Sequence, residues 1–189
     1  MKSIKFASAI ALAAGVLVMG SAQAADGGTI RIHGQVEDTT CSITGGAGTE
    51  GGTDTITVGL DKVAPAALTA AGTSGIGRKQ FTLNIGAPGE GSCENGKIAD
   101  LSFVTSSARI DAATGTLTNA APFGAQNTNI QLTSATGAPY NLADPTVIVS
   151  SPEIAGNQTT ITMGAQYYAT GAATPGPVDT NVQYQVTYR

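Results

Sequence analysis

The sequence predicts an all-β protein, a sandwich or barrel of short strands. Glycine and threonine abound, tryptophan is absent and charged residues make up 12% of the chain, a composition typical of turn-rich β structure with small side chains. Runs of alternating apolar and polar residues recur between clusters of Gly, Pro, Asn and Asp, at the spacing of a sandwich or barrel. We expect strands at 29–36, 55–60, 80–85, 98–104, 129–133, 146–150, 159–168 and 181–188.

The first 24 residues have the layout of a secretory signal peptide. Lys2 and Lys5 precede an apolar run over 6–19, and small residues follow it as far as Ala24. The run is shorter than the roughly 20 residues that a bilayer-spanning helix needs, so removal after Ala24 is favoured over retention as an anchor. The mature chain then begins at Ala25 and has 165 of the 189 residues, enough for one domain with a substantial core.

The strand expected at 29–36 has one apolar face and one polar face. Its apolar face is formed by alternate residues, namely Gly28, Ile30, Ile32, Gly34 and Val36. Glycine inside a strand weakens it and usually marks a bulge or the close approach of another backbone, so Gly34 needs an explanation. On this pattern alone, the favoured interpretation is an ordinary first strand of a self-contained sandwich.

Charge and chemistry argue against a nucleic-acid partner and against catalysis. Without the leader the chain has a net charge of −6 and no basic cluster that could neutralise phosphates. The single histidine, His33, lies on the polar strand face beside Arg31, where a solvated residue is expected rather than a base. Glu37 and Asp38 would face opposite ways in a strand. We therefore expect no enzyme, no cofactor and no metal site, because the usual transition-metal ligands are too few.

The two cysteines, Cys41 and Cys93, both follow the export signal. An even count in an exported chain predicts a disulfide, with two buried free thiols as the alternative. Closing a loop of about 50 residues would stabilise the fold by roughly 4 kcal/mol before any strain is subtracted.

The middle of the chain contains little helix. Only 61–71 could be helical, and Pro65 and Gly72 limit it to a turn or two. The low-complexity stretches 45–52 and 170–177 are expected to be loops. The glycines within 42–59 lack the strand–loop–helix context of a phosphate site, so a flexible loop is the favoured interpretation there.

The last strand, 181–188, alternates as strictly as the first. Val182, Tyr184, Val186 and Tyr188 share one face, and only Arg189 follows them. A bare sheet edge is an aggregation hazard that natural proteins cover or pair. An ordinary last strand paired internally remains the alternative.

Four blocks of sequence, each weak alone, occur in order with the two cysteines. The blocks are 27–34 before Cys41; 60–63, Leu68, 72–78, Phe81, Leu83 and Ile85 before Cys93; 115–119 with 129–132; and 167–170 with 182–188. Together they resemble chaperone–usher fimbrial subunits of the type 1 pilin family over essentially the whole mature sequence.

The resemblance implies an incomplete immunoglobulin-like β-sandwich that lacks its last strand and is completed by donor-strand complementation, a known form of β-strand addition. In that family a periplasmic chaperone lends a strand to the open groove. The N-terminal extension of the next subunit then replaces that strand at an outer-membrane usher. This implies a homopolymer of identical or related pilin subunits, exported through the periplasm to the extracellular fimbrium on the bacterial surface.

Residue by residue, the resemblance implies that Gly28, Ile30, Ile32, Gly34 and Val36 form the donor strand, with Gly34 at a position that is small throughout the family. Val182, Tyr184, Val186 and Tyr188 would form the edge beside the acceptor groove, and the terminal carboxylate of Arg189 would anchor the chaperone. Two departures bear on subunit packing: Gln166 replaces a common arginine, and 175–177 reads Pro-Gly-Pro in place of a single glycine turn.

These expectations divide the chain into a signal peptide (1–24), a donor-strand extension (25–40) and a pilin domain (41–189). The expected function is a structural fimbrial subunit that supports cell adhesion, in the rod rather than as a minor adaptor. The alternative from another class is a self-contained secreted module that binds carbohydrate.

Overall fold

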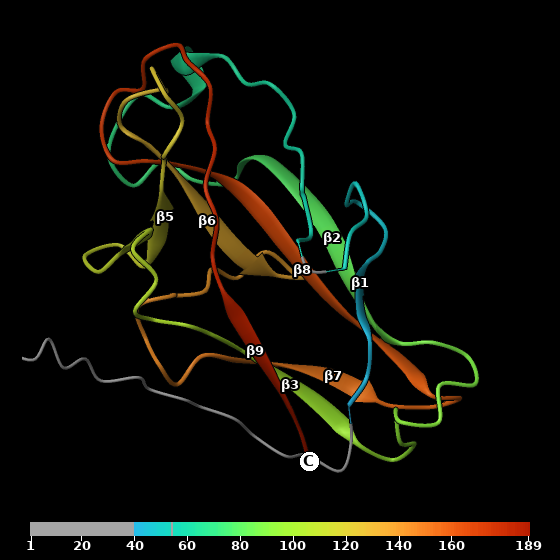
Figure 1. The fold of residues 1–189 in the computed structure, drawn as a ribbon. Coiled ribbons are helices and arrows are strands. Elements are labelled where there is room, and N and C mark those ends of the chain that lie inside the picture. Colours follow the sequence, from blue (N-terminus) through green and yellow to red (C-terminus); the bar gives the residue numbers. More distant parts are fainter. Residues whose placement is uncertain (1–39, 54) are drawn as a thin grey trace, which may run out of the picture. The chain divides into compact units, whose positions relative to one another are not determined.

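The computed structural model describes residues 40–53 and 55–189, which form two β-sheets packed face to face (Figure 1). The signal peptide, most of the donor-strand extension and the strand expected at 29–36 lie outside the described residues. Among the residues described, no helix is long and apolar enough to span a membrane.

The larger sheet has six strands in the order β1-β2-β8-β6-β5-β4. All neighbouring pairs are antiparallel. The strands are β1 (Ile43–Gly45), β2 (Ile76–Gly86), β4 (Ile110–Asp111), β5 (Thr116–Thr118), β6 (Thr128–Ser134) and β8 (Gln158–Ala169). The long strand β8 is central: it pairs with β2 on one side and with β6 on the other.

The smaller sheet has three antiparallel strands in the order β7-β3-β9. They are β3 (Ile98–Phe103), β7 (Ile148–Glu153) and β9 (Tyr184–Tyr188). The middle strand β3 buries Ala99, Leu101 and Phe103 on one face, as the period of two in a strand requires.

The core lies between the two sheets. Alternate residues of β2, β6 and β8 meet the buried face of β3 and β7 in one hydrophobic cluster. The members from the larger sheet are Phe81, Leu83, Ile85, Leu117, Ile130, Leu132, Ile161, Met163 and Ala165. Two apolar inner faces in contact are the defining feature of a β-sandwich, so the predicted fold class is confirmed.

Six of the expected strands are present, with shifted ends. The ranges 80–85, 129–133 and 159–168 lie inside β2, β6 and β8, whereas 98–104, 146–150 and 181–188 correspond to β3, β7 and β9. The expected helical turn is the short 3-10 helix η1, Pro65–Ala67, which begins at a proline as helix starts commonly do.

The prediction of a strand at 55–60 is wrong, because this segment pairs with no other strand. Its periodicity is real: Ile56, Val58 and Leu60 are half-buried against the core. Its backbone instead makes isolated bonds, in which Thr57 O accepts from Glu50 N at 2.9 Å. Apolar alternation was therefore a correct guide to the buried face here, although not to strand pairing.

The expected disulfide joins Cys41 to Cys93, with 4.5 Å between the two Cα atoms. It fixes the start of β1, which was not expected within the loop 42–59, to the segment before β3. Two further bonds hold the same place: Ser42 N and Ser42 Oγ both donate to the Glu90 carboxylate, at 2.6 and 2.7 Å. The Ser42 hydroxyl and amide accordingly hold the pKa of Glu90 below its usual value.

Candidate functional site

Strand β9 is the edge of the three-stranded sheet, and no described strand lies beyond it. Residues Ile98 and Arg189 exchange both backbone hydrogen bonds, at 3.0 and 3.1 Å, and Val104 N donates to Gln183 O at 2.9 Å. In an antiparallel ladder such bonded pairs recur at every second residue. The odd-numbered residues of β9 therefore bond to β3, and the N–H and C=O groups of Val182, Tyr184 and Val186 point to the open side.

The irregular segment 55–60 forms a second wall opposite β9 (Figure 1). Its half-buried residues Ile56, Val58 and Leu60 contact the core. A lysine from β2 secures the far side of this wall, where Lys79 Nζ donates to Gly59 O at 2.7 Å.

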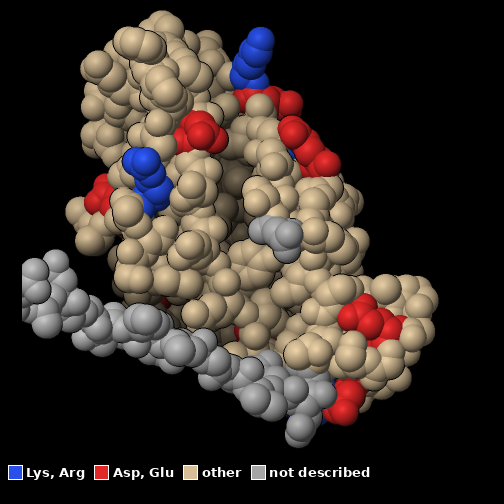
Figure 2. Space-filling view, in the orientation of Figure 1, with Lys and Arg blue, Asp and Glu red and all other residues tan. Residues whose placement is uncertain are grey.

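A groove of about 890 Å³ lies between these walls. Its floor consists of core side chains from both sheets, so the interior of the sandwich is open along this line. The floor residues are Phe81, Leu83, Leu101, Phe103, Leu117, Ile130, Leu132, Met163 and Ala165. Figure 2 shows the hollow with uncharged side chains at its centre, and Asp179 is the one charged residue among the described residues that line it.

Two tyrosines contribute to the groove. Burial raises the pKa of Tyr184 above its usual value, and burial together with the nearby Asp61 raises that of Tyr167. Tyr167 Oη donates to Asp61 O at 3.1 Å. Both rings are therefore neutral at physiological pH and add apolar surface rather than charge.

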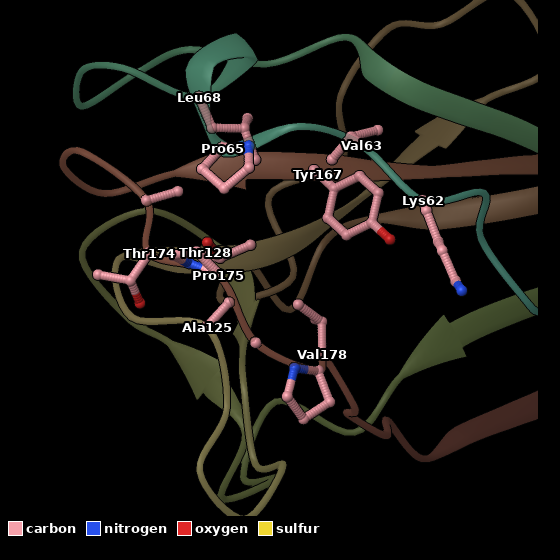
Figure 3. A pocket seen from close by; sticks show the side chains of 13 residues that line it. Lys62, Val63, Pro65, Leu68, Ala125, Thr128, Tyr167, Thr174, Pro175 and Val178 are labelled. Carbon is pink, nitrogen blue, oxygen red and sulfur yellow. The ribbon is translucent and has the colours of Figure 1, made fainter.

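A second cavity of about 520 Å³ adjoins one end of the groove and shares Tyr167 and Val178 with it. Figure 3 shows Pro65 and Leu68 on one side of this end cavity and Val178 on the other, with the Tyr167 ring from β8 between them. Gly77 makes room for this ring: its φ is +61°, and a β-carbon there would lie 2.9 Å from Val63 Cγ1 and 3.0 Å from the Tyr167 ring.

The polar face of the smaller sheet holds an ion pair at the end of β9. Arg189 Nε lies 2.6 Å from Asp100 Oδ2, and the Asp100 side chain is 13% exposed. A hydrogen bond from Ser150 and then the Arg189 guanidinium hold the pKa of Asp100 below its usual value. The pair links the residue after β9 to the central strand β3.

The expected edge residues occupy the positions that the alternation predicts. Val182, Tyr184, Val186 and Tyr188 are half-buried against the core, whereas Arg189 is exposed on the opposite face of the sheet. The donor residues Gly28, Ile30, Ile32, Gly34 and Val36 lie outside the described residues, so their role stays a prediction.

The sequence did not predict that 55–60 forms a wall of the groove. It also did not predict that Arg189 pairs with Asp100. The alternation at 55–60 indicates a buried face, but only the structure places this segment opposite β9. At the departure from the family pattern, Gln166 Nε2 donates to Gln131 Oε1 at 2.8 Å, and both side chains are buried. Within 40–53 and 55–189, no group of three His, Cys, Asp or Glu residues could hold a metal ion.

Comparisons with known proteins point to fimbrial proteins. A family model described as "Fimbrial protein" matches residues 30–189. The chain is 35% identical to an F17 fimbrial protein of Escherichia coli, over 100% of both chains. It is 34% identical to the major fimbrial subunit SMF-1 of Stenotrophomonas maltophilia, over 89% of this chain and 95% of that one. A solved chaperone–usher pilus shares the fold at a TM-score of 0.51 and 14% identity, over 87% of this chain and 97% of that one.

Proposed function

The chain belongs to the fimbrial protein family and is a structural subunit of a chaperone–usher fimbria, and from this premise we propose that copies polymerise by inserting the segment 25–40 of one copy into the groove of the next. The observation that carries the proposal is the groove itself. It exposes core side chains along one line, beside an edge strand with open backbone groups.

A single extended strand fits both features of the groove. The N–H and C=O groups of Val182, Tyr184 and Val186 can pair with a strand, while the apolar floor receives every second side chain. The residues 28–36 would span roughly 30 Å when extended, about the length of the edge 181–188. Because cross-strand partners share a face, the even-numbered donor residues would point into the groove.

The donor strand is expected to run antiparallel to β9. The two walls run in opposite directions: 55–60 leads toward the end cavity and 178–184 leads away from it. An inserted strand is therefore antiparallel to one wall and parallel to the other. The regular edge is β9, and antiparallel pairs are slightly more stable per residue than parallel pairs. In this direction Val36 would leave the groove beside Val178 and the end cavity.

Burial of the donor side chains supplies much of the driving force. Transfer of Ile30, Ile32 and Val36 into the groove would each contribute roughly 1.5 to 3 kcal/mol. At Gly34 the inserted strand would pass close to a side chain of the groove floor, leaving no room for a larger residue. Such a close approach would explain a glycine inside a strand. The open amides of the edge would gain partners at the same time.

The same groove would hold a strand from a periplasmic chaperone before assembly, and an outer-membrane usher would exchange it for the donor segment. A chain that folds with an open apolar groove needs such protection. The disulfide Cys41–Cys93 suits passage through an oxidising compartment. We place the subunit in the fibre rod, in line with the relative named a major fimbrial subunit.

Deletion of 28–36 tests the proposal. The deleted chain should bind its chaperone but form no fibres, as judged by electron microscopy of the cell surface. Unaltered fibres would contradict the proposal.

A further inference from the structure

Phe123 is an unusual residue on the surface of the domain. Its side chain is 100% exposed, and its φ is +54°, a backbone region that bulky residues rarely adopt. Single exposed apolar residues are common on protein surfaces. An aromatic side chain that is exposed by a strained backbone is not, because such strain persists only where the surroundings enforce it.

Asn119 enforces the conformation of the loop 120–125. Its Nδ2 donates to Ala125 O and to Pro177 O, both at 3.0 Å. Its Oδ1 accepts from Ala121 N and Asp179 N, also at 3.0 Å. This one amide therefore uses both its donors and both acceptor positions to clasp the loop against 177–179.

Backbone bonds reinforce the same clasp. Ala120 N donates to Asp179 O at 2.7 Å and Ala125 N donates to Pro177 O at 2.9 Å. The loop is thus held rigidly while its aromatic tip contacts nothing within the described chain. Aromatic residues are enriched at protein interfaces, and a rigid exposed one loses little entropy on binding.

The clasp places Phe123 at a defined end of the groove. Val178 and Asp179 belong to the clasped segment 177–179. Both line the groove, and Val178 also lines the second cavity, which adjoins this end. Val36 of an inserted donor segment would leave the groove at this same end.

The donor segment leaves little slack between copies. Only three residues separate Val36 from Thr40, so their two Cα atoms can be at most about 14 Å apart. Thr40 is already fixed in its own domain, where its N–H donates to Ser92 O at 3.2 Å, next to the disulfide Cys41–Cys93. The disulfide end of the next copy must therefore sit near the loop that carries Phe123.

We propose that Phe123 is a contact residue between successive copies of this chain, and that it docks on the surface around the disulfide of the next copy. That surface offers exposed apolar atoms at Ala87 and Pro88, in the loop between β2 and Cys93. The inference rests on the proposed function, which supplies the insertion of the donor segment. It adds a second interface that fixes the angle between neighbouring subunits.

Photo-crosslinking in assembled fibres tests the contact. A benzophenone-bearing phenylalanine replaces Phe123, and the same residue at Ile148, which is 55% exposed on β7, is the matched control. After irradiation, position 123 should give covalent chain multimers on denaturing gels, with crosslinks that map to residues 87–93 of a second chain. Fibres that yield no multimers from position 123, or no more than from 148, would overturn the inference.

A pair of substitutions separates the contact from folding. Asparagine tolerates positive φ, so Phe123→Asn should leave the thermal midpoint of the chaperone-bound subunit unchanged, while assembled fibres dissociate roughly tenfold faster in denaturant. Phe123→Tyr should behave as the unaltered chain. Fibres of Phe123→Asn that are as durable as the parent, or that lose only the ability to bind cells, would contradict a contact between copies.

Deletion of 28–36 tests the proposed function separately, since fibres that form without that segment would refute donor insertion whatever Phe123 contacts.

Discussion

The guanidinium of Arg189 lies 2.6 Å from the carboxylate of Asp100, so the end of the edge strand is fastened to the central strand of its sheet. The residues are diagonal neighbours in the β3–β9 ladder, in which Asp100 is opposite Thr187. The bond links the residue that follows β9 to the middle of β3. The proposed role of β9 as an acceptor strand requires such a hold, because a frayed edge offers no fixed row of amides to a partner.

The first prediction concerns acid. Hydrogen bonding from Ser150 and the charge of Arg189 lower the pKa of Asp100 from its usual value of 3.8. A carboxyl group with a lowered pKa in the folded state adds stability above its unfolded pKa, and this is lost as the pH falls through the folded pKa. The free energy of unfolding should therefore fall more steeply below pH 3.8 for the parent chain than for Asp100→Asn. Equal slopes in urea titrations across that range would contradict the role of the ion pair.

The second prediction concerns the wall at 55–60. Val58→Asn places an amide on the groove side of the wall, where Val58 is half-buried, and should weaken donor insertion by roughly 2 kcal/mol. Surface fibres, counted by electron microscopy, should become rare. Thr53→Asn is the control, because Thr53 is exposed and does not line the groove. Equal fibre numbers in the two variants would argue against this wall as part of the site.

The third prediction concerns the disulfide. Joint replacement Cys41→Ser and Cys93→Ser opens a loop with a sequence separation of 52 residues and should lower the free energy of unfolding by up to roughly 4 kcal/mol. Urea denaturation of the chaperone-bound subunit at neutral pH measures the loss. Reduction of the parent with a thiol should reproduce the same midpoint, and a change below about 1 kcal/mol would contradict the predicted role.

The fourth prediction concerns the glycine beside the disulfide. Gly86 has a φ of +75°, and a β-carbon there would lie 2.6 Å from Cys93 Sγ and would clash with Asn157 O. Gly86→Ala should therefore cost roughly 2 kcal/mol or more, from backbone strain and overpacking together. Gly91→Ala is the matched control, since a β-carbon at Gly91 meets nothing within 4 Å. Thermal unfolding of both variants should separate them clearly, and similar midpoints would show that Gly86 is not under steric constraint.

Sequence periodicity was a good guide wherever a strand is long and buried on one face. The alternation of Phe81, Leu83 and Ile85 places β2 correctly, because only one of the two strand faces can bury all three apolar side chains. The strands β4 and β5 escape detection, since two or three residues hold too few alternations to form a pattern. The same limit applies to β1, which has three residues and lies next to a glycine-rich stretch that is typical of a loop.

The groove shows where local pattern stops being informative. Ile56, Val58 and Leu60 have the alternation of a strand, yet they form a wall without a ladder, because whether a segment pairs depends on a partner elsewhere in the chain. The clasp of Asn119 is likewise invisible in sequence, since two of its four bonds reach residues that are 58 and 60 positions away. The edge residues Val182 to Tyr188 were predictable because their faces follow from the period alone.

Disulfide trapping between copies tests the central claim most directly. Copies with Tyr184→Cys on the groove wall are assembled with differently tagged copies that carry one cysteine at Ile30, Arg31, Ile32 or His33. Because only residues that share a face come close enough to bridge, we predict mixed-tag disulfides from positions 30 or 32 and none from 31 or 33. Bridges from the odd positions alone, or no bridges in fibres that form normally, would contradict insertion of this segment into a neighbour's groove.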